Sequence, residues 1–141
     1  MLIEPLRVLA NEQTETLRRL IDQLAPALGC RPTVCLSTGE FRHTEEFMSD
    51  PPPDGEILVV TPERLDLLLR NPENDAFLAS IGSVVVDEAH LLADERRGRT
   101  LEGLITGLLL LAEDQHRIPP RLLLLSATLP EPERITRWLG V

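Results

Sequence analysis

An acidic pair closes one of the apolar runs of this 141-residue chain. Asp87 and Glu88 directly follow the valines of Ser83–Val86, and His90 comes two residues later. Adjacent carboxylates at the end of a buried strand can serve a nucleotide phosphate, because one holds Mg²⁺ through water and the other orients the attacking water. An isolated acidic pair is usually a solvated turn, but the valines before it and the histidine after it favour the catalytic interpretation.

The chain has no lysine, and all fourteen of its Lys and Arg residues are arginines. A phosphate-binding loop of the G-x-x-x-x-G-K-[ST] type requires a lysine and is therefore excluded from these residues. The sequence thus predicts the metal and water half of an ATPase site without the half that cradles the phosphates.

A second polar turn, Ser126–Thr128, closes the leucine run Leu122–Leu125. Its hydroxyls lie within reach of a neighbouring strand end, so we expect Ser126 or Thr128 to form a hydrogen bond with His90. The chain lacks the H-E-x-x-H spacing of a zinc-binding helix, and we therefore do not interpret His90 as a zinc ligand.

Other strand ends carry groups that suit a nucleic-acid backbone. A helix should begin at Thr61 and Pro62, because Thr is a favoured N-cap and Pro a favoured first residue. The free N–H groups of such a helix start attract phosphate, and Arg64 adds a positive charge nearby. Arg7 and Gly39 are similar candidates, although each of these features is also common in turns that bind nothing.

Short apolar runs alternate with segments of helical period, which predicts an α/β domain with a parallel sheet. Continuous Val and Leu runs suit strands that are covered by helices on both faces. Because the carboxyl ends of parallel strands share one edge of a sheet, the turns described above should meet there. The expected strands are Met1–Ile3, Thr33–Leu36, Ile57–Val60, Val84–Val86 and Leu122–Leu125, and the expected helices are Leu6–Leu28, Pro62 to about Asn71, Thr100–Leu111 and Pro132–Leu139.

Composition indicates one acidic globular domain. The hydrophobic fraction of 43% and the charged fraction of 26% are ordinary for globular proteins. The net charge of −9 argues against a free-standing nucleic-acid binder, which normally presents a basic face. Cys30 and Cys35 have no nearby Cys or His partners for zinc, and two reduced thiols fit a cytoplasmic protein. No run is long and apolar enough to predict a membrane-spanning segment.

Taken in this order, the motifs resemble the first RecA-like domain of superfamily 2 helicases. The segment Asp87–Glu102, which opens with Asp-Glu-Ala-His, is similar to the superkiller-type helicases and their relatives. In those proteins a Gly-rich turn of acidic and basic residues leads into a helix that starts with Leu-Glu. The resemblance spans nearly the whole chain, and the matching segments are Pro5–Glu12 (motif Ia), Thr38–Glu40 (the Thr-Gly-Asp element, with Glu in the last place), Thr61–Asp66 (motif Ib), Asp87–His90 (motif II) and Ser126–Thr128 (motif III).

The resemblance implies a role for each matched position. The parent protein would be an ATP-dependent DNA or RNA helicase, with ATP and Mg²⁺ as cofactors and single-stranded DNA or RNA as a partner. Asp87 would bind Mg²⁺ through water, and Glu88 would activate the water for ATP hydrolysis. His90, Ser126 and Thr128 would couple the nucleotide state to the nucleic-acid track. The residues expected along that track are Pro5, Arg7, Gly39, Thr61, Pro62 and Arg64.

The family pattern also contains parts that this sequence lacks. In the family, a phosphate-binding loop and an adenine-recognising segment precede motif Ia, and a second RecA-like domain with arginine fingers follows motif III. We therefore expect residues 1–141 to form a partial first RecA-like domain that by itself binds ATP weakly or not at all. The strand Leu122–Leu125 would then keep an unpaired apolar edge, so the missing helicase domains or a second copy of the chain are expected partners.

A function of a different class is the alternative. The same sheet edge could bind a nucleic-acid backbone or a partner protein without ATP, as a non-catalytic binding module. Phosphate contacts would make such binding fall steeply as the salt concentration rises. A nucleotide-independent metal hydrolase would need metal ligands beyond Asp87, Glu88 and His90, and the sequence offers none.

Overall fold

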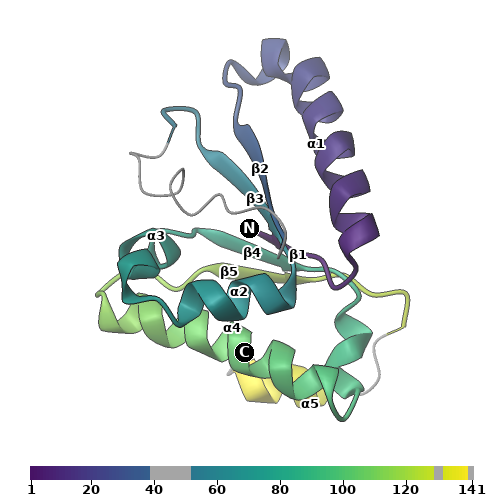
Figure 1. Ribbon diagram of the computed structural model, residues 1–141, viewed down its shortest axis with the longest axis vertical. Helices are drawn as coiled ribbons and strands as arrows, with labels where there is room; N and C mark the ends of the chain where they lie inside the picture. Colours follow the sequence, from purple (N-terminus) through teal and green to yellow (C-terminus); the bar gives the residue numbers. More distant parts are fainter. Residues whose placement is uncertain (39–51, 129–131, 140–141) are drawn as a thin grey trace.

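The computed structural model describes residues 1–38, 52–128 and 132–139, which form one parallel five-stranded sheet with helices on both faces (Figure 1). Gly39, which we expected to contact nucleic acid, lies outside these residues. The strands are β1 (Leu2–Ile3), β2 (Thr33–Ser37), β3 (Glu56–Val60), β4 (Ser83–Val86) and β5 (Arg121–Leu124). The helices are α1 (Arg7–Leu28), α2 (Pro62–Leu69), α3 (Asp75–Ala79), α4 (Arg97–Asp114) and α5 (Pro132–Leu139), with the 3₁₀ turns η2 (Pro72–Asn74) and η3 (Ala89–Ala93). None of these helices combines the length and the apolarity needed to cross a membrane.

Strand β1 forms the centre of the sheet, whose order is β2-β3-β1-β4-β5. All neighbouring strands are parallel, as the alternation of apolar runs and helices predicted. Leu2 pairs with Val59 of β3 and with Val85 of β4, so the two halves of the sheet meet on a strand of 2 residues. The described strands therefore all end along a single edge of the sheet.

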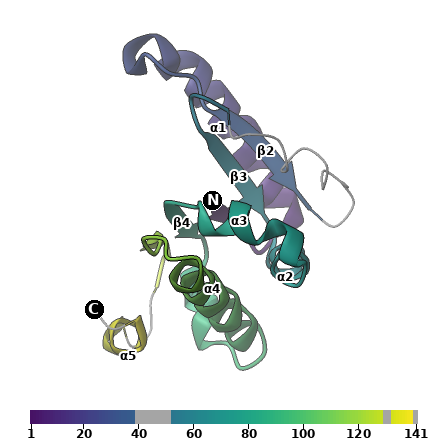
Figure 2. The same ribbon diagram turned by 90° about the vertical axis from the view of Figure 1, so that its left-hand side faces the viewer.

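The two faces of the sheet bury different side chains, because successive strand residues point to opposite sides. On one face, Val34 and Val59 pack with Ala10 and Ile21 of α1. Figure 2 shows α1 beside β2 and β3, whereas α2, α3 and α4 gather on the other side of the sheet. The larger cluster on that side consists of Ile3, Leu58, Val60, Leu65, Leu68, Leu78, Val84, Val86, Leu101, Leu104, Ile105 and Leu108.

The helix ends largely follow the signals in the sequence. Helix α1 stops at Gly29, which has a left-handed φ of 68° and donates its N–H to Ala25 O at 3.0 Å. Helix α2 begins at Pro62 directly after Thr61, as predicted, but the Thr61 side chain makes no capping hydrogen bond. The first turn of α2 thus keeps N–H groups that no side chain of the helix start satisfies.

The elements η2 and α3 were not predicted, because Asn71 followed by Pro72 is typical of a helix end. The chain turns there and packs again instead of forming a surface loop. The buried Asn74 donates its side-chain N–H to Leu68 O at 3.0 Å, which ties the turn to the end of α2. Leu78 and Ala79 are then buried, although their short apolar run shows no clear period in the sequence.

Strand β5 lies at the edge of the sheet, as expected, and part of it is exposed. Leu123 and Leu125 are 43% and 48% exposed, because α1 covers the β2 and β3 half of this face. Exposed edge strands with apolar side chains promote association with other chains. The expected self-association through this edge stays a prediction, which sedimentation of the purified chain can test.

Gly98, near the start of α4, allows a close approach between α4 and η3. A Cβ at this position would lie 2.3 Å from Leu92 O, so any larger residue would overlap the backbone. Gly103, further along the same helix, faces open space, and nothing lies within 4 Å of its Cβ position. The fold of the described residues therefore requires glycine at the first position and not at the second.

We expect Gly98→Ala to lower the free energy of unfolding by about 1–3 kcal/mol, which is the usual cost of overpacking. Gly103→Ala is the matched control and should raise the free energy of unfolding by up to about 1 kcal/mol, because alanine favours a helix interior. Urea denaturation followed by circular dichroism measures both changes. Equal effects of the two substitutions would show that the contact with Leu92 does not restrict residue 98.

Candidate functional site

Three backbone hydrogen bonds join the strand ends that carry the predicted site. Glu4 N–H donates to Val60 O at 2.9 Å, Asp87 N–H to Ile3 O at 3.0 Å, and Ala89 N–H to Leu125 O at 2.8 Å. The bonds continue the parallel pairing past the ends of the strands and into the polar turns. The turns after β1, β3, β4 and β5 therefore lie side by side along one edge, as predicted.

The acidic pair sits in a tight turn between β4 and η3. Asp87 is half-buried, and its Oδ1 accepts a hydrogen bond from Glu88 N–H at 2.8 Å, which fixes the orientation of the carboxylate. Glu88 has φ 51° and ψ 43°, a left-handed conformation that is uncommon for residues other than Gly, Asn and Asp. Strained backbone of this kind clusters at functional sites, because the surrounding structure must hold it.

His90 contacts the acidic pair and not the neighbouring strand. Its Nδ1 lies 3.0 Å from Glu88 Oε2, and both side chains remain partly exposed. Ser126 Oγ donates to Thr128 O at 2.6 Å, so the Ser-Ala-Thr turn closes on itself. The expected hydrogen bond between His90 and Ser126 or Thr128 is therefore wrong for the described residues, because each partner finds an acceptor or a charge closer along the chain.

Glu4 is a buried carboxyl that the sequence reasoning did not select. It has no exposed surface, its Oε1 accepts from Leu6 N–H at 3.0 Å, and its Oε2 lacks a partner among the described residues. Burial raises the pKa of Glu4, the hydrogen bond from Leu6 opposes this, and the charges of Asp87 and Glu88 raise it further. A glutamate placed directly before Pro5 at the end of an apolar run was the available signal.

The residues predicted to contact nucleic acid, apart from Gly39, occupy the β1 and β3 part of the same edge. Thr61 is buried at the end of β3, and Arg7 is an exposed residue at the start of α1. Arg64 Nε donates to Ser37 Oγ at 3.1 Å, which links α2 to the end of β2. The Nη2 atom of Arg64 is buried and has no partner among the described residues.

Asp87 suits a Mg²⁺ ion that takes most of its ligands from water and phosphate oxygens. Mg²⁺ in nucleotide sites is usually held by one or two carboxylates together with phosphate and water. Within residues 1–38, 52–128 and 132–139, no three His, Cys, Asp or Glu side chains are grouped as metal ligands. The oriented carboxylate of Asp87 thus fits the role of a single protein ligand, with Glu88 beside it.

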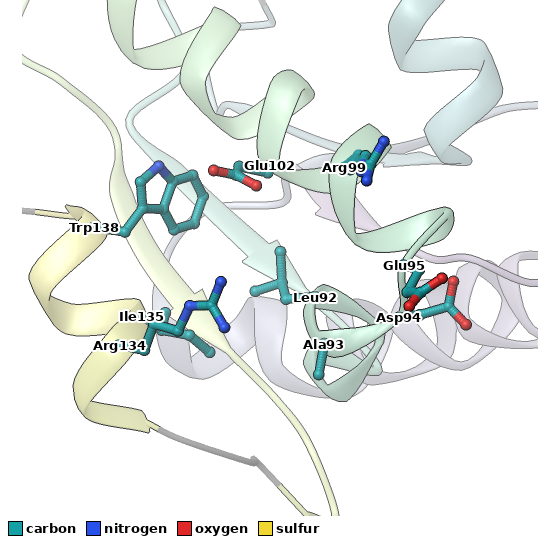
Figure 3. A pocket seen from close by; sticks show the side chains of 9 residues that line it. All are labelled: Leu92, Ala93, Asp94, Glu95, Arg99, Glu102, Arg134, Ile135 and Trp138. Carbon is teal, nitrogen blue, oxygen red and sulfur yellow. The ribbon is translucent and has the colours of Figure 1, made fainter.

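A cavity of about 470 Å³ lies beyond the acidic turn, between η3, the start of α4 and α5. Figure 3 shows the Trp138 ring and the Glu102 carboxylate pointing toward each other across it, with Leu92 and Arg134 below. None of the predicted site residues lines this cavity, so it does not extend the catalytic edge.

A parallel α/β sheet with an acidic turn, a hydroxyl turn and helix starts along one edge is the architecture of a RecA-like motor domain. The family model for the DEAD/DEAH box helicase matches residues 1–135. The chain therefore belongs to the DEAD/DEAH box helicase family.

The most similar proteins include archaeal DNA helicases. The chain is 34% identical over 140 residues to the ATP-dependent DNA helicase Hel308 of Thermoplasma volcanium, covering 98% of this chain and 18% of that protein. It is 38% identical over 111 residues to Hel308 of Pyrobaculum calidifontis, covering 76% and 14% respectively. The structure of Mycobacterium smegmatis helicase Lhr bound to ssDNA and AMP-PNP shares 30% identity with a TM-score of 0.73, covering 96% of this chain and 18% of that chain.

The chain thus spans at most 18% of the length of these relatives. The structure of Mss116p bound to ssRNA and AMP-PNP has a TM-score of 0.67 at 20% identity, which supports the fold alone.

We expect Glu4→Gln to change how stability depends on pH. The pKa of Glu4 is higher in the folded chain than in the unfolded chain, so its contribution to stability should fall as the pH rises between those two values. The glutamine amide carries no charge and its oxygen can still accept from Leu6 N–H. Unfolding by urea in EDTA, at about pH 4 and about pH 8, should therefore show a gain for the variant only at the higher pH.

Glu12→Gln, on the exposed face of α1, serves as the control for loss of a carboxylate. A difference between wild type and Glu4→Gln that is the same at both pH values would contradict the buried, proton-binding role of Glu4.

Proposed function

We propose that this chain is the part of an ATP-dependent helicase motor that holds Mg²⁺ and the hydrolytic water and contacts one strand of nucleic acid. The observation that carries the proposal is the set of hydrogen bonds between strand ends, which places the acidic turn and the helix start of α2 on one edge. A motor requires this proximity, because events at the nucleotide must reach the strand that is moved.

In this proposal each residue of the acidic turn has a distinct task. Asp87 would hold Mg²⁺ through water, and that ion would neutralise charge on the transferred phosphate. Glu88 would accept a proton from the attacking water. His90, whose Nδ1 lies 3.0 Å from Glu88 Oε2, keeps that carboxylate in place. Ser126 and Thr128 lie on the next strand end and relay the nucleotide state.

The opposite end of the same edge contacts the sugar-phosphate backbone. The N–H groups at the start of α2 provide donors for phosphate oxygens, and the Arg64 guanidinium adds positive charge beside them. Pro5 and Arg7 flank this position at the start of α1, and Thr61 and Pro62 shape the turn. We take single-stranded DNA as the preferred track, because Hel308 is a DNA helicase and the Lhr structure contains ssDNA.

Binding of a fluorescein-labelled oligo-dT to the purified chain tests the track. We expect weak binding that falls with salt, and Arg64→Gln should reduce the slope of log K against log salt by about 0.7, the value for one phosphate contact on a single strand. Arg117→Gln, before β5 and away from the edge, removes the same charge and should leave the slope unchanged. If both variants change the slope equally, the binding depends on net charge alone, and the assignment of Arg64 to a phosphate contact is wrong. A labelled oligo-U measures the preference for DNA in the same assay.

Mn²⁺, a paramagnetic substitute for Mg²⁺, tests the metal half of the site. We expect Asp87→Asn to remove about one weak Mn²⁺ site, because the protein supplies one or two carboxylates to such an ion. Asp94→Asn is the control, since Asp94 Oδ1 already accepts from the N–H groups of Arg96 and Arg97. Water-proton relaxation measures the bound ion. The assignment of Asp87 fails if both variants lose the same amount of Mn²⁺.

A further inference from the structure

A groove of about 1000 Å³ runs between α2 and α4, on the opposite side of the sheet from α1. None of the residues predicted to bind nucleotide or nucleic acid lines it. Figures 1 and 2 both show α2 beside α4, and the two helices pack directly against each other beneath the groove. The groove is therefore a feature of the surface that the proposed motor function does not use.

Two glycines open the α4 side of the groove. Gly103 and Gly107 both line it, and they lie one helical turn apart on the same face. A Cβ on Gly107 would lie 3.4 Å from Leu69 Cδ1, so this glycine has an internal packing role. Gly103 has none, because nothing lies within 4 Å of its Cβ position. Glycine weakens a helix interior, so the fold gives no reason for Gly103 unless another backbone approaches there.

Apolar side chains form the walls of the groove. Leu67 of α2 and Leu110 of α4 are 54% and 58% exposed, and both line the groove. Leu104 and Leu111 lie between them and continue into the buried cluster. Two large exposed leucines thus face the same groove, one from each helix, and give it an apolar lining that a partner could cover.

The rim of the groove is acidic, which selects among possible occupants. Four carboxylates line it, and two arginines oppose them. One of those arginines, Arg70, is already paired with Asp66 at 2.8 Å. Glu63, Asp75 and Asp114 remain along the rim against Arg99, so the rim keeps a net negative charge. A second copy of this chain, whose net charge is −9, would bring the same carboxylates against one another. A nucleic-acid backbone is also negatively charged and would be repelled in the same way.

We propose that the groove between α2 and α4 binds an amphipathic helix of a partner protein, with an apolar ridge that enters the groove and arginine or lysine residues along its edges. Among the α4 residues that line the groove, residues 103, 107, 110 and 114 lie on one face and span about 16 Å of helix. This length matches about three turns of a partner helix. The backbone of that helix approaches Gly103, and its ridge packs between Leu67 and Leu110.

The test uses two labelled peptides of about 18 residues, which is about 27 Å of helix. Both carry the same leucine and alanine ridge, and one has arginines along its edges where the other has glutamates. Fluorescence anisotropy with the purified chain should show at least about tenfold tighter binding of the arginine peptide, and added salt should weaken that binding. Equal binding of both peptides, or none of either, would overturn the proposal.

Substitutions on α4 locate the binding. Gly103→Leu fills the groove and also raises the helix propensity of α4. It should lower the affinity for the arginine peptide by about tenfold or more, which is typical of a residue at the centre of an interface. Glu113→Leu adds the same side chain to an exposed position of α4 outside the groove, and should leave the affinity within about twofold. Circular dichroism establishes that both variants fold. Unchanged affinity in Gly103→Leu would overturn the proposal.

Sedimentation of the same samples tests the competing occupant. If the chain dimerises and Gly103→Leu abolishes the dimer, the groove binds a second copy and the proposal of a basic partner helix is wrong. A sedimentation coefficient that does not change between wild type and Gly103→Leu agrees with a separate partner.

Discussion

The pairing of β1 with both of its neighbours is the constraint on which the rest of the structure depends. Leu2 and Ile3 align β3 on one side with β4 on the other, and the adjoining N–H groups of Glu4 and Asp87 extend that alignment beyond the strands. Because the strands are parallel, every connecting helix runs back across the sheet in the same sense. Every polar turn that follows a strand then lies at the same edge of the sheet. The acidic turn lies beside the start of α2 because both are held at the end of the same short strand.

This arrangement concentrates negative charge at one place, and the local structure shows its effects. Burial raises the pKa of Glu4, and the charges of Asp87 and Glu88 raise it further. At the same place, Glu88 has a left-handed backbone. A fold selected for stability alone would place neither feature there. A phosphate and its metal ion would reverse the balance, because they bring compensating charge and ligands to carboxylates that are otherwise close to one another. The crowding of carboxylates along this edge therefore has a cost for the fold itself.

The strands and most helices could be predicted from the sequence, because apolar runs and helical periods report burial directly. The site edge followed from strand placement, which is why Asp87, Thr61 and Ser126 were assigned to one border. Glu4 could not be predicted in the same way, since its burial depends on β3 and β4, which are distant in sequence. The contact of His90 with Glu88 was missed for a local reason, because it depends on the conformation of the turn between them, in which Glu88 has a left-handed backbone.

The shortness of β1 also governs the order in which the chain acquires its structure. Leu2 must find Val59 and Val85, both far along the chain, and closing such long loops costs entropy before any contact compensates. The β2–β3 and β4–β5 pairs lie closer in sequence and can assemble earlier. On the ribosome, β1 leaves the exit tunnel before either of its partners has been made. The central strand is therefore made first and stays unpaired until β3 and then β4 have been made, so the centre of the sheet depends on its most distant contacts.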